Sequence, residues 1–383
     1  MIDQIKIFLD QPNPSPQTGN EESTMSRMPT VEDVARLAGV SRQTVSNVLN
    51  TPAIVREATR HRVEVAIRDL GYRPHASARR LRTRKAGTIG MRIDPWRDGI
   101  SGAVLDRLLH KLTERAESRG MRVMVFSAED HAHEVEVIRR LREGSDVDAF
   151  MLTATTHDDP RIGALSQMGV PFVAFGRPWG AAAGRTPHRW IDVDGRSGVA
   201  EAVRRLREGG ARRIAWIGWP QGSGTGDERA AGWRSASGLD DREAQLLSRS
   251  AEDGVAAGTR CAAELLRLAD PPDAIVCASD SLALGALIAV QGTARPETCV
   301  VGFDDTPVAA AVGLSSIEQP LDGVVAAALE LLFGPEGDDV LPNPDSNEEP
   351  THRLLVPQLV ERTPGQLTFD ATPAVDAGNH MKG

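Results

Sequence analysis

The chain has 383 residues, 40% of them hydrophobic and 25% charged, and its formal net charge is −9. The length suggests two or three domains, and the composition is that of a globular protein, which excludes bulk disorder and collagen-like repeats. Because polar residues interrupt the longest apolar stretches, the sequence predicts no membrane span.

The first 28 residues show no helical or strand periodicity and contain three closely spaced prolines. We expect a disordered extension here and no secretory signal, because no small-residue cleavage site follows the short apolar patch at the start. A protein without such a signal is expected in the cytoplasm. Met25 and Met28 come just before the first organised segment, so Met1, Met25 and Met28 are all candidate start residues.

Basic residues are concentrated in one short segment. Residues 29–86 hold 12 Lys and Arg against 5 Asp and Glu, a balance of +7 that leaves −16 for the rest of the chain. A small basic module joined to a larger acidic one is typical of a protein that contacts phosphates at one end. We therefore expect this segment to bind nucleic acid.

The basic segment has the pattern of a helix-turn-helix. Thr30 and Asp33 have the spacing of a capping box, and apolar residues then recur at helical spacing up to Gly39. Ser41 is a candidate N-cap for a second helix, and a third helix is expected over residues 56–70. Two helices joined by a tight turn that contains glycine form a helix-turn-helix.

The second of these helices carries polar side chains that suit the reading of DNA bases. Arginine bonds guanine O6 and N7, glutamine or asparagine bonds adenine, and both geometries fit a helix in the major groove. The alternative is a three-helix bundle whose polar second helix is only solvated, but the positive balance of the segment favours DNA binding. The side chains concerned are Arg42, Gln43, Thr44, Ser46 and Asn47.

The run TVEDVARLAGVSRQTVSNVLN, followed by VREATRHRVEVAIRDLGYRPHASARRL, resembles the DNA-binding head of the LacI/GalR family of bacterial transcriptional repressors. The resemblance implies a recognition helix and, over about residues 75–81, a hinge helix whose leucine wedges into the minor groove at the centre of the operator. It implies that Arg42, Gln43 and Asn47 contact bases, that Ser41, Thr44 and Ser46 contact phosphates, and that Asn50, Tyr72, His75, Ala78 and Leu81 complete the DNA-binding set.

Two residues depart from the family pattern. Asn47 stands where many members have Arg, and His75 stands where Asn is usual after Pro74. The first departure leaves the operator sequence open. The second is expected to weaken or retune the hinge, and a histidine there can make the hinge sensitive to pH.

Residues 87–362 alternate between short β-rich runs and helical stretches, as in an α/β domain. Such alternation predicts parallel sheets covered by helices on both faces, and ligands of these sheets lie beyond the carboxyl ends of the strands. The candidate strands are residues 88–93, 122–126, 149–152, 172–175, 214–217, 274–277 and 298–301, and the candidate helices are residues 103–119, 131–141, 199–208 and 254–268.

Three of the six tryptophans follow predicted strands, namely Trp96, Trp179 and Trp219. Indole rings stack on the apolar faces of sugars, so this placement favours a carbohydrate-binding cleft. The alternative is that each indole only fills core or loop space. Trp216, inside a strand, and Trp233, inside a helix, are expected in the core.

The family resemblance extends over about residues 30–362 and includes the segments GARRIAWIG, ASDSLALGAL and VGFDD. It implies an effector domain with the periplasmic sugar-binding-protein fold, in which a ligand lies between two Rossmann-like halves joined by three crossings. Asp194, Arg229 and Asp280 match the family's polar effector contacts, and Asp227 shares a loop with Arg229. The guanidinium of an arginine donates two parallel hydrogen bonds and an aspartate accepts two, so both can bind adjacent hydroxyls of a sugar. The alternative is that these side chains form salt bridges on the surface or between the two halves.

We therefore expect a small all-α helix-turn-helix domain followed by an α/β effector-binding and dimerisation domain of the periplasmic-binding-protein type. The expected boundaries are a disordered extension at 1–28, the helix-turn-helix domain at 29–74, the hinge helix and linker at 75–86, the effector domain at 87–362 and a disordered tail at 363–383. The expected halves of the effector domain are 87–208 with 297–318, and 210–296 with 319–362.

The second half departs from the family pattern near the expected cleft. The helix that contains Trp233 ends early, at about residue 237, and the connection over residues 290–296 is short. Residues 334–350, GPEGDDVLPNPDSNEEP, form an acidic, proline-rich insertion that we expect to be a mobile loop.

No enzyme or metal motif is complete in this sequence. GSGTGDER at 222–229 lacks the Gly-Lys-Ser/Thr of a phosphate-binding loop, and His131 and His133 lie on different faces of a predicted helix start. No nucleophile elbow of the G-x-S-x-G type occurs. The three cysteines are too far apart in the sequence for a disulfide framework or a zinc site, so we expect buried, reduced thiols and no cofactor.

We predict a DNA-binding regulator, not an enzyme, that represses transcription as a homodimer on a pseudopalindromic operator and is released by a small carbohydrate. A corepressor role for the ligand is equally allowed. The alternative is a regulator of the same architecture that responds to a nucleobase, a sugar phosphate or a protein corepressor. Two other classes are a transport-type sugar-binding protein, which would need an export signal, and a hydrolase acting on the same sugar. No counterpart of the family's tetramerisation helix follows Arg362, which favours a dimer.

Overall fold

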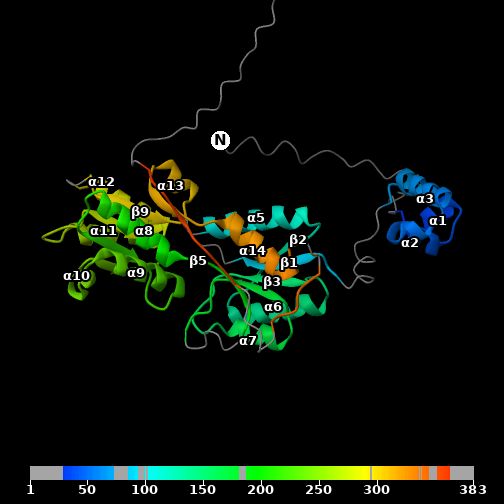
Figure 1. The fold of residues 1–383 in the computed structure, drawn as a ribbon, viewed down its shortest axis with the longest axis horizontal. Coiled ribbons are helices and arrows are strands. Elements are labelled where there is room, and N and C mark those ends of the chain that lie inside the picture. The colour runs from blue at the N-terminus through cyan, green and yellow to red at the C-terminus, as the bar shows by residue number, and fades with distance from the viewer. Residues whose placement is uncertain are drawn as a thin grey trace, which may run out of the picture. The chain divides into compact units, whose positions relative to one another are not determined.

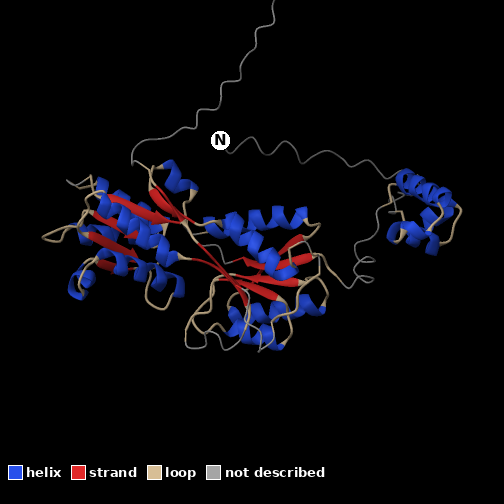
Figure 2. Cartoon of the chain, in the orientation of Figure 1, coloured by secondary structure: helices blue, strands red, loops and turns tan. Residues whose placement is uncertain are grey.

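The computed structural model describes residues 29–72, 85–93, 100, 102–180, 187–293, 296–335, 337, 339–344 and 352–362. These residues divide into a helical unit, within residues 1–83, and an α/β unit, within residues 84–383. Figure 1 labels many of the elements of both units, and Figure 2 colours helices and strands differently. Of the helices that are described, none is long and apolar enough to cross a membrane.

The helical unit has the capping interactions that the sequence predicts. The side chain of Thr30 accepts from the N–H of Asp33 in a capping box at the start of α1, and Gly39 ends this helix in a left-handed conformation with φ 64°. The side chain of Ser41 caps α2 by accepting from the N–H of Thr44. Apolar side chains from α1, α2 and α3 form the core of the helical unit. The elements are α1 (Val31–Ala38), α2 (Arg42–Asn50), the 3-10 turn η1 (Pro52–Ile54) and α3 (Glu57–Leu70).

The first sheet of the α/β unit has six parallel strands in the order β11-β5-β4-β3-β1-β2. Helices α5 and α14 cover one face and α6 and α7 cover the other (Figure 1). The strands are β1 (Thr88–Ile93), β2 (Arg122–Ser127), β3 (Ala149–Leu152), β4 (Phe172–Phe175), β5 (Arg189–Val193) and β11 (His352–Leu355), and the helices are α5 (Ala103–Ser118), α6 (His131–Glu143), α7 (Pro160–Gln167) and α14 (Leu321–Phe333).

The second sheet has the strand order β12-β10-β9-β8-β6-β7, in which only the pairing of β12 with β10 is antiparallel. Helices α8 and α9 pack together, as do α11 and α12, and both pairs contact the sheet. The strands are β6 (Ile214–Gly218), β7 (Ser248–Ser250), β8 (Ala274–Cys277), β9 (Cys299–Phe303), β10 (Ser315–Glu318) and β12 (Gln358–Val360). The helices are α8 (Gly195–Glu208), α9 (Gly224–Ser237), α10 (Asp241–Leu246), α11 (Val255–Leu266), α12 (Asp280–Gln291) and α13 (Pro307–Ala311).

The chain crosses between the sheets after β5, after β10 and after β11, so three crossings join the halves. The expected assignment of the later segments to the halves was wrong. Residues 297–318 belong to the second sheet, because β9 pairs with β8 and β10 pairs with β9. Helix α14 and strand β11 belong to the first sheet, because Leu321 and Val324 pack with Ile89 and β11 pairs with β5. Helix α8 packs in the core of the second sheet.

Two local expectations concern the cysteines and the acidic insertion. The thiols of Cys261 and Cys277 are buried, as expected, but Cys299 is exposed because it lies at the start of β9. Part of the acidic insertion is held in place, because the Asn343 side chain donates to the carbonyl of Val170 at 2.7 Å. The expectation that the insertion is a mobile loop stays a prediction, and residues 336, 338 and 345–350 of the insertion lie outside the described part of the chain.

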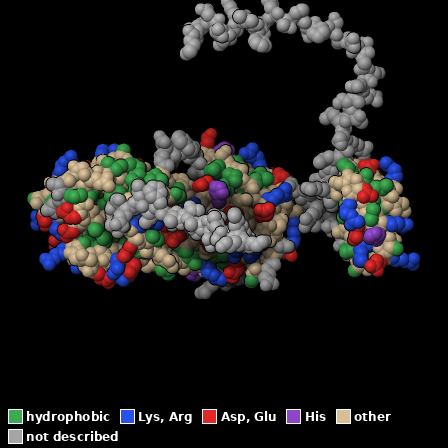
Figure 3. Space-filling view, turned by 90° about the horizontal axis from the view of Figure 1, so that it is seen from above, with side chains coloured by type: hydrophobic (Ala, Val, Ile, Leu, Met, Phe, Trp, Pro, Cys, Tyr) green, Lys and Arg blue, Asp and Glu red, His purple; other side chains and the backbone are tan. Residues whose placement is uncertain are grey.

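Acidic and basic side chains are interspersed on the surface, as Figure 3 shows for one face. On α6, for example, the guanidinium of Arg139 donates to Glu136 at 2.6 Å and to Glu143 at 2.5 Å. Exposed pairs of this kind stabilise a fold by at most about 1 kcal/mol each. The stability of the α/β unit therefore comes mainly from its three buried apolar clusters.

Candidate functional site

The first candidate site is the exposed face of α2. Arg42 and Gln43 are exposed, while Val45 and Val48 of the same helix are buried in the core of the helical unit. The guanidinium of Arg42 lies 2.6 Å from a carboxylate oxygen of Glu32 on α1. The structure therefore presents Arg42 and Gln43, two of the three predicted base-reading side chains, to solvent on one face of a helix whose other face is buried, while Asn47 is half-buried.

Contacts along α2 bring the other predicted DNA-binding residues together. The amide of Gln43 donates to Oδ1 of Asn47 at 3.0 Å, and the hydroxyls of Ser41 and Thr44 lie 2.9 Å apart. Ser46 is half-buried on the same helix. These polar groups are close enough to contact neighbouring positions of one groove.

The remaining predicted DNA-binding residues are placed differently. Tyr72 is 8% exposed and packs in the core of the helical unit, so its ring supports the fold of the head. Asn50 ends α2. His75, Ala78 and Leu81 of the expected hinge helix lie outside the described residues.

The second candidate site lies where the carboxyl ends of the two sheets meet. The indole of Trp179, which follows β4, donates from Nε1 to Oγ1 of Thr155, which follows β3, at 3.3 Å. A Cβ atom added to Gly224, at the start of α9 in the second half, would lie 2.2 Å from Cδ2 of this indole. Trp179 therefore lies directly against the backbone of the opposite half.

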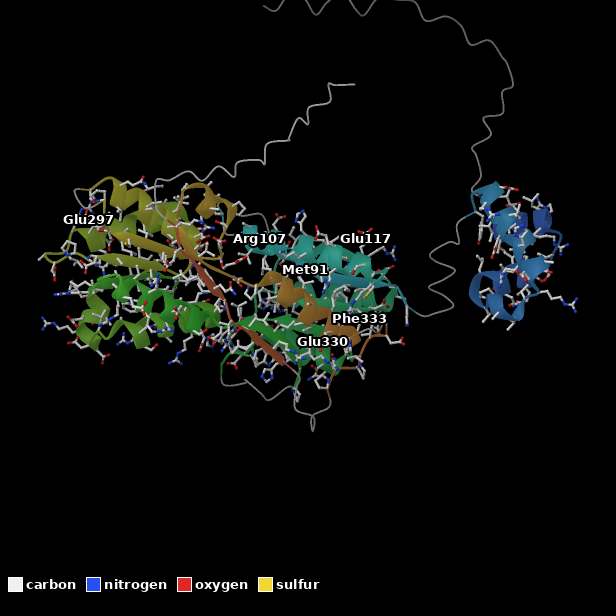
Figure 4. The ribbon with its side chains drawn as sticks, turned by 45° about the horizontal axis from the view of Figure 1, so that its top comes forward. Met91, Arg107, Glu117, Glu297, Glu330 and Phe333 are labelled. Carbon is white, nitrogen blue, oxygen red and sulfur yellow. The ribbon has the colours of Figure 1, made fainter. Side chains whose placement is uncertain are left out.

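Charged side chains cross the same boundary. His157 Nε2 lies 3.6 Å from Asp227 Oδ2, and Arg177 Nη1 lies 3.7 Å from Glu228 Oε2. Arg107, at the start of α5, donates to the backbone carbonyl of Asp305 at 2.8 Å. Figure 4 shows Arg107 at the end of α5 that faces the second half. The boundary is therefore made of direct polar and aromatic contacts.

Arg229 of α9 is the one predicted effector contact with a positively charged side chain, and it is buried. It is 4% exposed, and its guanidinium carbon lies 3.5 Å from the ring centroid of Phe303 and 5.2 Å from that of Trp219. Nη1 donates to the carbonyl of Ala278 at 2.6 Å, and Nη2 lies 3.7 Å from Oδ1 of Asp304. Burial lowers the pKa of Arg229.

Asp304 lies in this site, although it is not among the residues predicted from the sequence. It belongs to the segment VGFDD, which resembles the family. Its backbone has φ 106°, which is rare for a residue with a side chain, and Gln319 donates to its Oδ1 at 2.7 Å. Burial raises the pKa of Asp304 to about 7, although the nearby Arg229 opposes this rise. The site therefore contains a carboxyl group that titrates near neutral pH.

Asp194 and Trp219 have polar partners beside the boundary. Asp194 caps α8 by accepting from the N–H of Ser197 at 3.0 Å, immediately after the first crossing. Trp219, which follows β6, donates from Nε1 to Oδ1 of Asp253 at 3.1 Å. Asp253 also accepts from the hydroxyl of Ser279. Trp96, the remaining predicted aromatic contact, lies outside the described residues.

Asp280 is held by hydrogen bonds from two other elements of the second half. It is 1% exposed, and its two oxygens accept from the hydroxyl of Ser316 at 2.5 Å and from the N–H of Thr306 at 2.7 Å. Burial raises its pKa. The Asp280 carboxylate therefore joins α12 to β10 and to the start of α13, and its expected role as an effector contact stays a prediction.

A groove of about 760 Å³ lies elsewhere, at the amino-terminal edge of the second sheet. It is lined in part by Arg205, Asp273, Glu297 and Leu359. Figure 4 shows Glu297 at the end of the second half remote from Arg107. Since ligands of parallel sheets lie beyond the carboxyl ends of the strands, this groove is not the predicted cleft.

The boundary between the halves has the chemistry to recognise a neutral, polyhydroxylated ligand. Trp179 and Trp219 offer apolar ring faces, the arginines offer fixed donors, and Asp194 and Asp227 offer acceptors. No metal-binding group of three or more His, Cys, Asp or Glu side chains occurs among the described residues. The separate face of α2 has the chemistry to read base edges.

The chain is similar to known proteins over most of its length. Residues 30–75 match the family described as bacterial regulatory proteins, lacI family, and residues 95–328 match periplasmic binding proteins and sugar-binding domains of that family. The chain is 35% identical to the transcriptional regulator CelR of Thermobifida fusca over 313 residues, which are 77% of this chain and 88% of CelR. It is 33% identical to the transcriptional regulator RafR of Escherichia coli, over 67% of this chain and 75% of RafR.

Solved structures give the same result. A CelR–cellobiose complex is 29% identical, with a TM-score of 0.61 over 88% of this chain and all of that one. The lac repressor dimer bound to operator and an anti-inducer is 24% identical, with a TM-score of 0.70 over 87% of this chain and 98% of that one, which supports the fold.

Proposed function

We propose that this member of the LacI family of bacterial regulatory proteins is a homodimeric repressor, which a small carbohydrate releases from its operator. The chain belongs to that family and is a DNA-binding transcriptional regulator, not an enzyme. The proposed boundaries of the DNA-binding domain and the hinge are residues 29–74 and 75–86. A dimer is proposed because a single recognition helix makes too few base contacts for high specificity, whereas two helices read both halves of a pseudopalindrome.

The placement of Trp179 is the observation that carries the carbohydrate part of this proposal. Thr155 orients the indole from one half, and Gly224 lies against it from the other half. A sugar ring that enters this boundary would meet an indole face together with the donors and acceptors of Arg177 and Asp227. Because CelR is bound to cellobiose in its solved complex, a β-linked disaccharide is the first ligand to test.

The ligand acts through the difference between its affinities for two states of the effector domain. In the structure, the two halves touch directly through Trp179, His157 and Arg177. We propose that a sugar replaces some of these contacts and thereby changes the relative position of the halves. If the operator binds the first arrangement and the sugar binds the second more tightly, the sugar lowers operator affinity by the same factor by which the operator lowers sugar affinity.

The proposal is tested by tryptophan fluorescence and melting temperature across a ligand panel. The panel contains cellobiose, other mono- and oligosaccharides, adenine, guanine and glucose 6-phosphate. A saturable shift with one sugar, absent in Trp179→Ala and retained in Trp190→Ala, is the expected result. Trp190 is a suitable control because its indole stacks on His352 at 4.3 Å, in a different contact.

Each other outcome has a defined meaning. A response to a nucleobase or to the sugar phosphate would replace the carbohydrate by that ligand class, and a sugar response that Trp179→Ala retains would move the site elsewhere. Turnover of the sugar would contradict a purely regulatory role. Operator binding is measured separately, with a duplex selected from a random library by the unaltered protein.

A further inference from the structure

One buried carboxylate holds the start of the α/β unit. Asp148 directly precedes β3, is 7% exposed and accepts from three successive backbone N–H groups. Its oxygens lie 2.8 Å from the nitrogen of Ala86, 2.6 Å from that of Gly87 and 3.2 Å from that of Thr88. In return, the N–H of Asp148 donates to the carbonyl of Thr88 at 2.9 Å. Hydrogen bonds to a carboxylate are roughly twice as strong as neutral ones.

Other groups hold the same short segment from different sides. Nη2 of Arg122, the first residue of β2, donates to the carbonyl of Ala86 at 2.9 Å. The ammonium of Lys85 forms an ion pair with Asp339 of the acidic insertion. Gly87 has φ 63°, a left-handed conformation that glycine adopts without strain. The segment is therefore attached to the first residue of β2, to the residue that precedes β3 and to the acidic insertion.

These contacts lie at the amino-terminal ends of the strands of the first sheet, whereas the proposed effector contacts lie at the carboxyl ends. β1 and β3 run parallel, so Asp148 and Thr88 lie at their amino-terminal ends, whereas His157 follows the carboxyl end of β3. Residues 73–84, which join the helical unit to the α/β unit, come immediately before Lys85 in the chain. Any mechanical link along the chain between the effector site and the head therefore passes through the segment that Asp148 holds.

We propose that Asp148, assisted by Arg122, is a positioning residue for regulation. It fixes residues 86–88, which follow the linker, to the first sheet. A displacement of the half that contains this sheet therefore moves the end of the linker by the same amount. The inference rests on the proposed effector response. If the three N–H bonds were lost, residues 85–87 would no longer be fixed to the first sheet, and a flexible connection couples two parts of a protein less strongly than a fixed one.

The test compares Asp148→Asn with Glu117→Gln in the full-length protein. Asparagine keeps the shape of aspartate but has a single acceptor oxygen, so bonds to the segment are lost. Glu117 is exposed on α5, at the opposite end from Arg107 (Figure 4), and its substitution changes the net charge equally. The measurements are cellobiose affinity, affinity for the selected operator duplex with and without saturating cellobiose, and hydrogen exchange of residues 85–93.

We expect Asp148→Asn to bind cellobiose within about twofold of the unaltered protein. The factor by which cellobiose changes operator affinity, typically about 5- to 150-fold in coupled systems, should fall to about one third or less. Exchange of the amides of Gly87 and Thr88 should accelerate about tenfold. Glu117→Gln should match the unaltered protein in every measurement. Full coupling in Asp148→Asn, despite faster exchange, would overturn the inference.

Failure of the proposed function gives a different result. If the unaltered protein binds the operator but cellobiose does not change its affinity, the effector part of the proposed function fails for this sugar. The inference is then judged by operator affinity alone, which should fall about tenfold in Asp148→Asn and stay constant in Glu117→Gln. Equal affinities would overturn it. If Asp148→Asn does not fold, Arg122→Gln is used in its place, with the same measurements and the same expected results. This substitution removes the hydrogen bond to Ala86 and changes an exposed residue.

Discussion

The carboxylate of Asp304 and the guanidinium of Arg229 lie 3.7 Å apart in a site that is almost closed to solvent. Burial acts in opposite directions on the two groups, lowering the pKa of Arg229 and raising that of Asp304 to about 7. Arginine is effectively always protonated in proteins, so the proton that is exchanged near neutral pH belongs to Asp304. This pair makes the boundary between the halves sensitive to pH.

Asp304→Asn should change the dependence of stability on pH. Because the pKa of Asp304 is higher in the folded than in the unfolded state, its contribution to stability is largest below about pH 4 and is lost as the pH rises through about 7. The unfolding free energy of the unaltered protein, relative to Asp304→Asn, should therefore fall between pH 5 and pH 8 by on the order of 1 to 3 kcal/mol. Urea denaturation at both pH values measures this difference.

Asp305→Asn is the control for this experiment, because Asp305 is adjacent and pairs instead with Arg362 at 2.5 Å. An equal pH dependence in both variants would show that Asp304 is not the titrating group. Asp159 and Asp280 also have shifted pKa values, so only the difference from the matched variant is informative.

Asp280→Ala should destabilise the second half of the effector domain. The substitution leaves the hydroxyl of Ser316 and the N–H of Thr306 without their buried acceptor, at a cost of about 1 to 3 kcal/mol for each unsatisfied group. Urea denaturation should show this loss, while sugar affinity measured well below the melting temperature should stay within about threefold. A large loss of sugar affinity in a fully stable Asp280→Ala protein would instead place this carboxylate in the ligand site.

Gly224→Ala should disturb the contact between the halves. The added methyl group would lie 2.2 Å from Cδ2 of Trp179, so the indole or the start of α9 must move. We expect a shift of the Trp179 emission in the absence of ligand and a change of at least about tenfold in sugar affinity. Gly163→Ala is the control, because a Cβ there meets no atom within 4 Å on helix α7. Identical emission and affinity in the two variants would argue against Trp179 as part of the site.

Arg42→Ala and Gln43→Ala should each weaken discrimination of the operator from random DNA. A base contact of this kind contributes about 1 to 3 kcal/mol of specificity, whereas phosphate contacts contribute mainly affinity that depends on salt. Competition binding with selected and random duplexes measures the ratio. Arg36→Ala on α1, whose side chain is 77% exposed, is the charge-matched control and should preserve the ratio. Unchanged discrimination in the α2 variants would mean that another element reads the bases.

The three helices of the helical unit and many elements of the α/β unit were predictable because local chemistry specifies them. The capping box of Thr30 and Asp33, the left-handed Gly39 and the apolar run of β1 act over a few residues. The same holds for the exposed face of α2, since its polar and apolar positions alternate with helical periodicity. Short strands with mixed composition, such as β7 and β12, carry too little local signal and were missed.

Local patterns in the sequence specify many of the helices and strands, the family and the residue types at the strand ends. The sheet that each later segment joins depends on tertiary contacts, because β9 pairs with β8 and α14 packs on the first sheet through contacts distant in sequence. The tertiary structure also decided that the Asp280 carboxylate holds Ser316 and Thr306, while Asp304 shares a buried site with Arg229. Burial and hydrogen-bond partners set the role and the pKa of a carboxylate, and these depend on neighbours that no local pattern specifies.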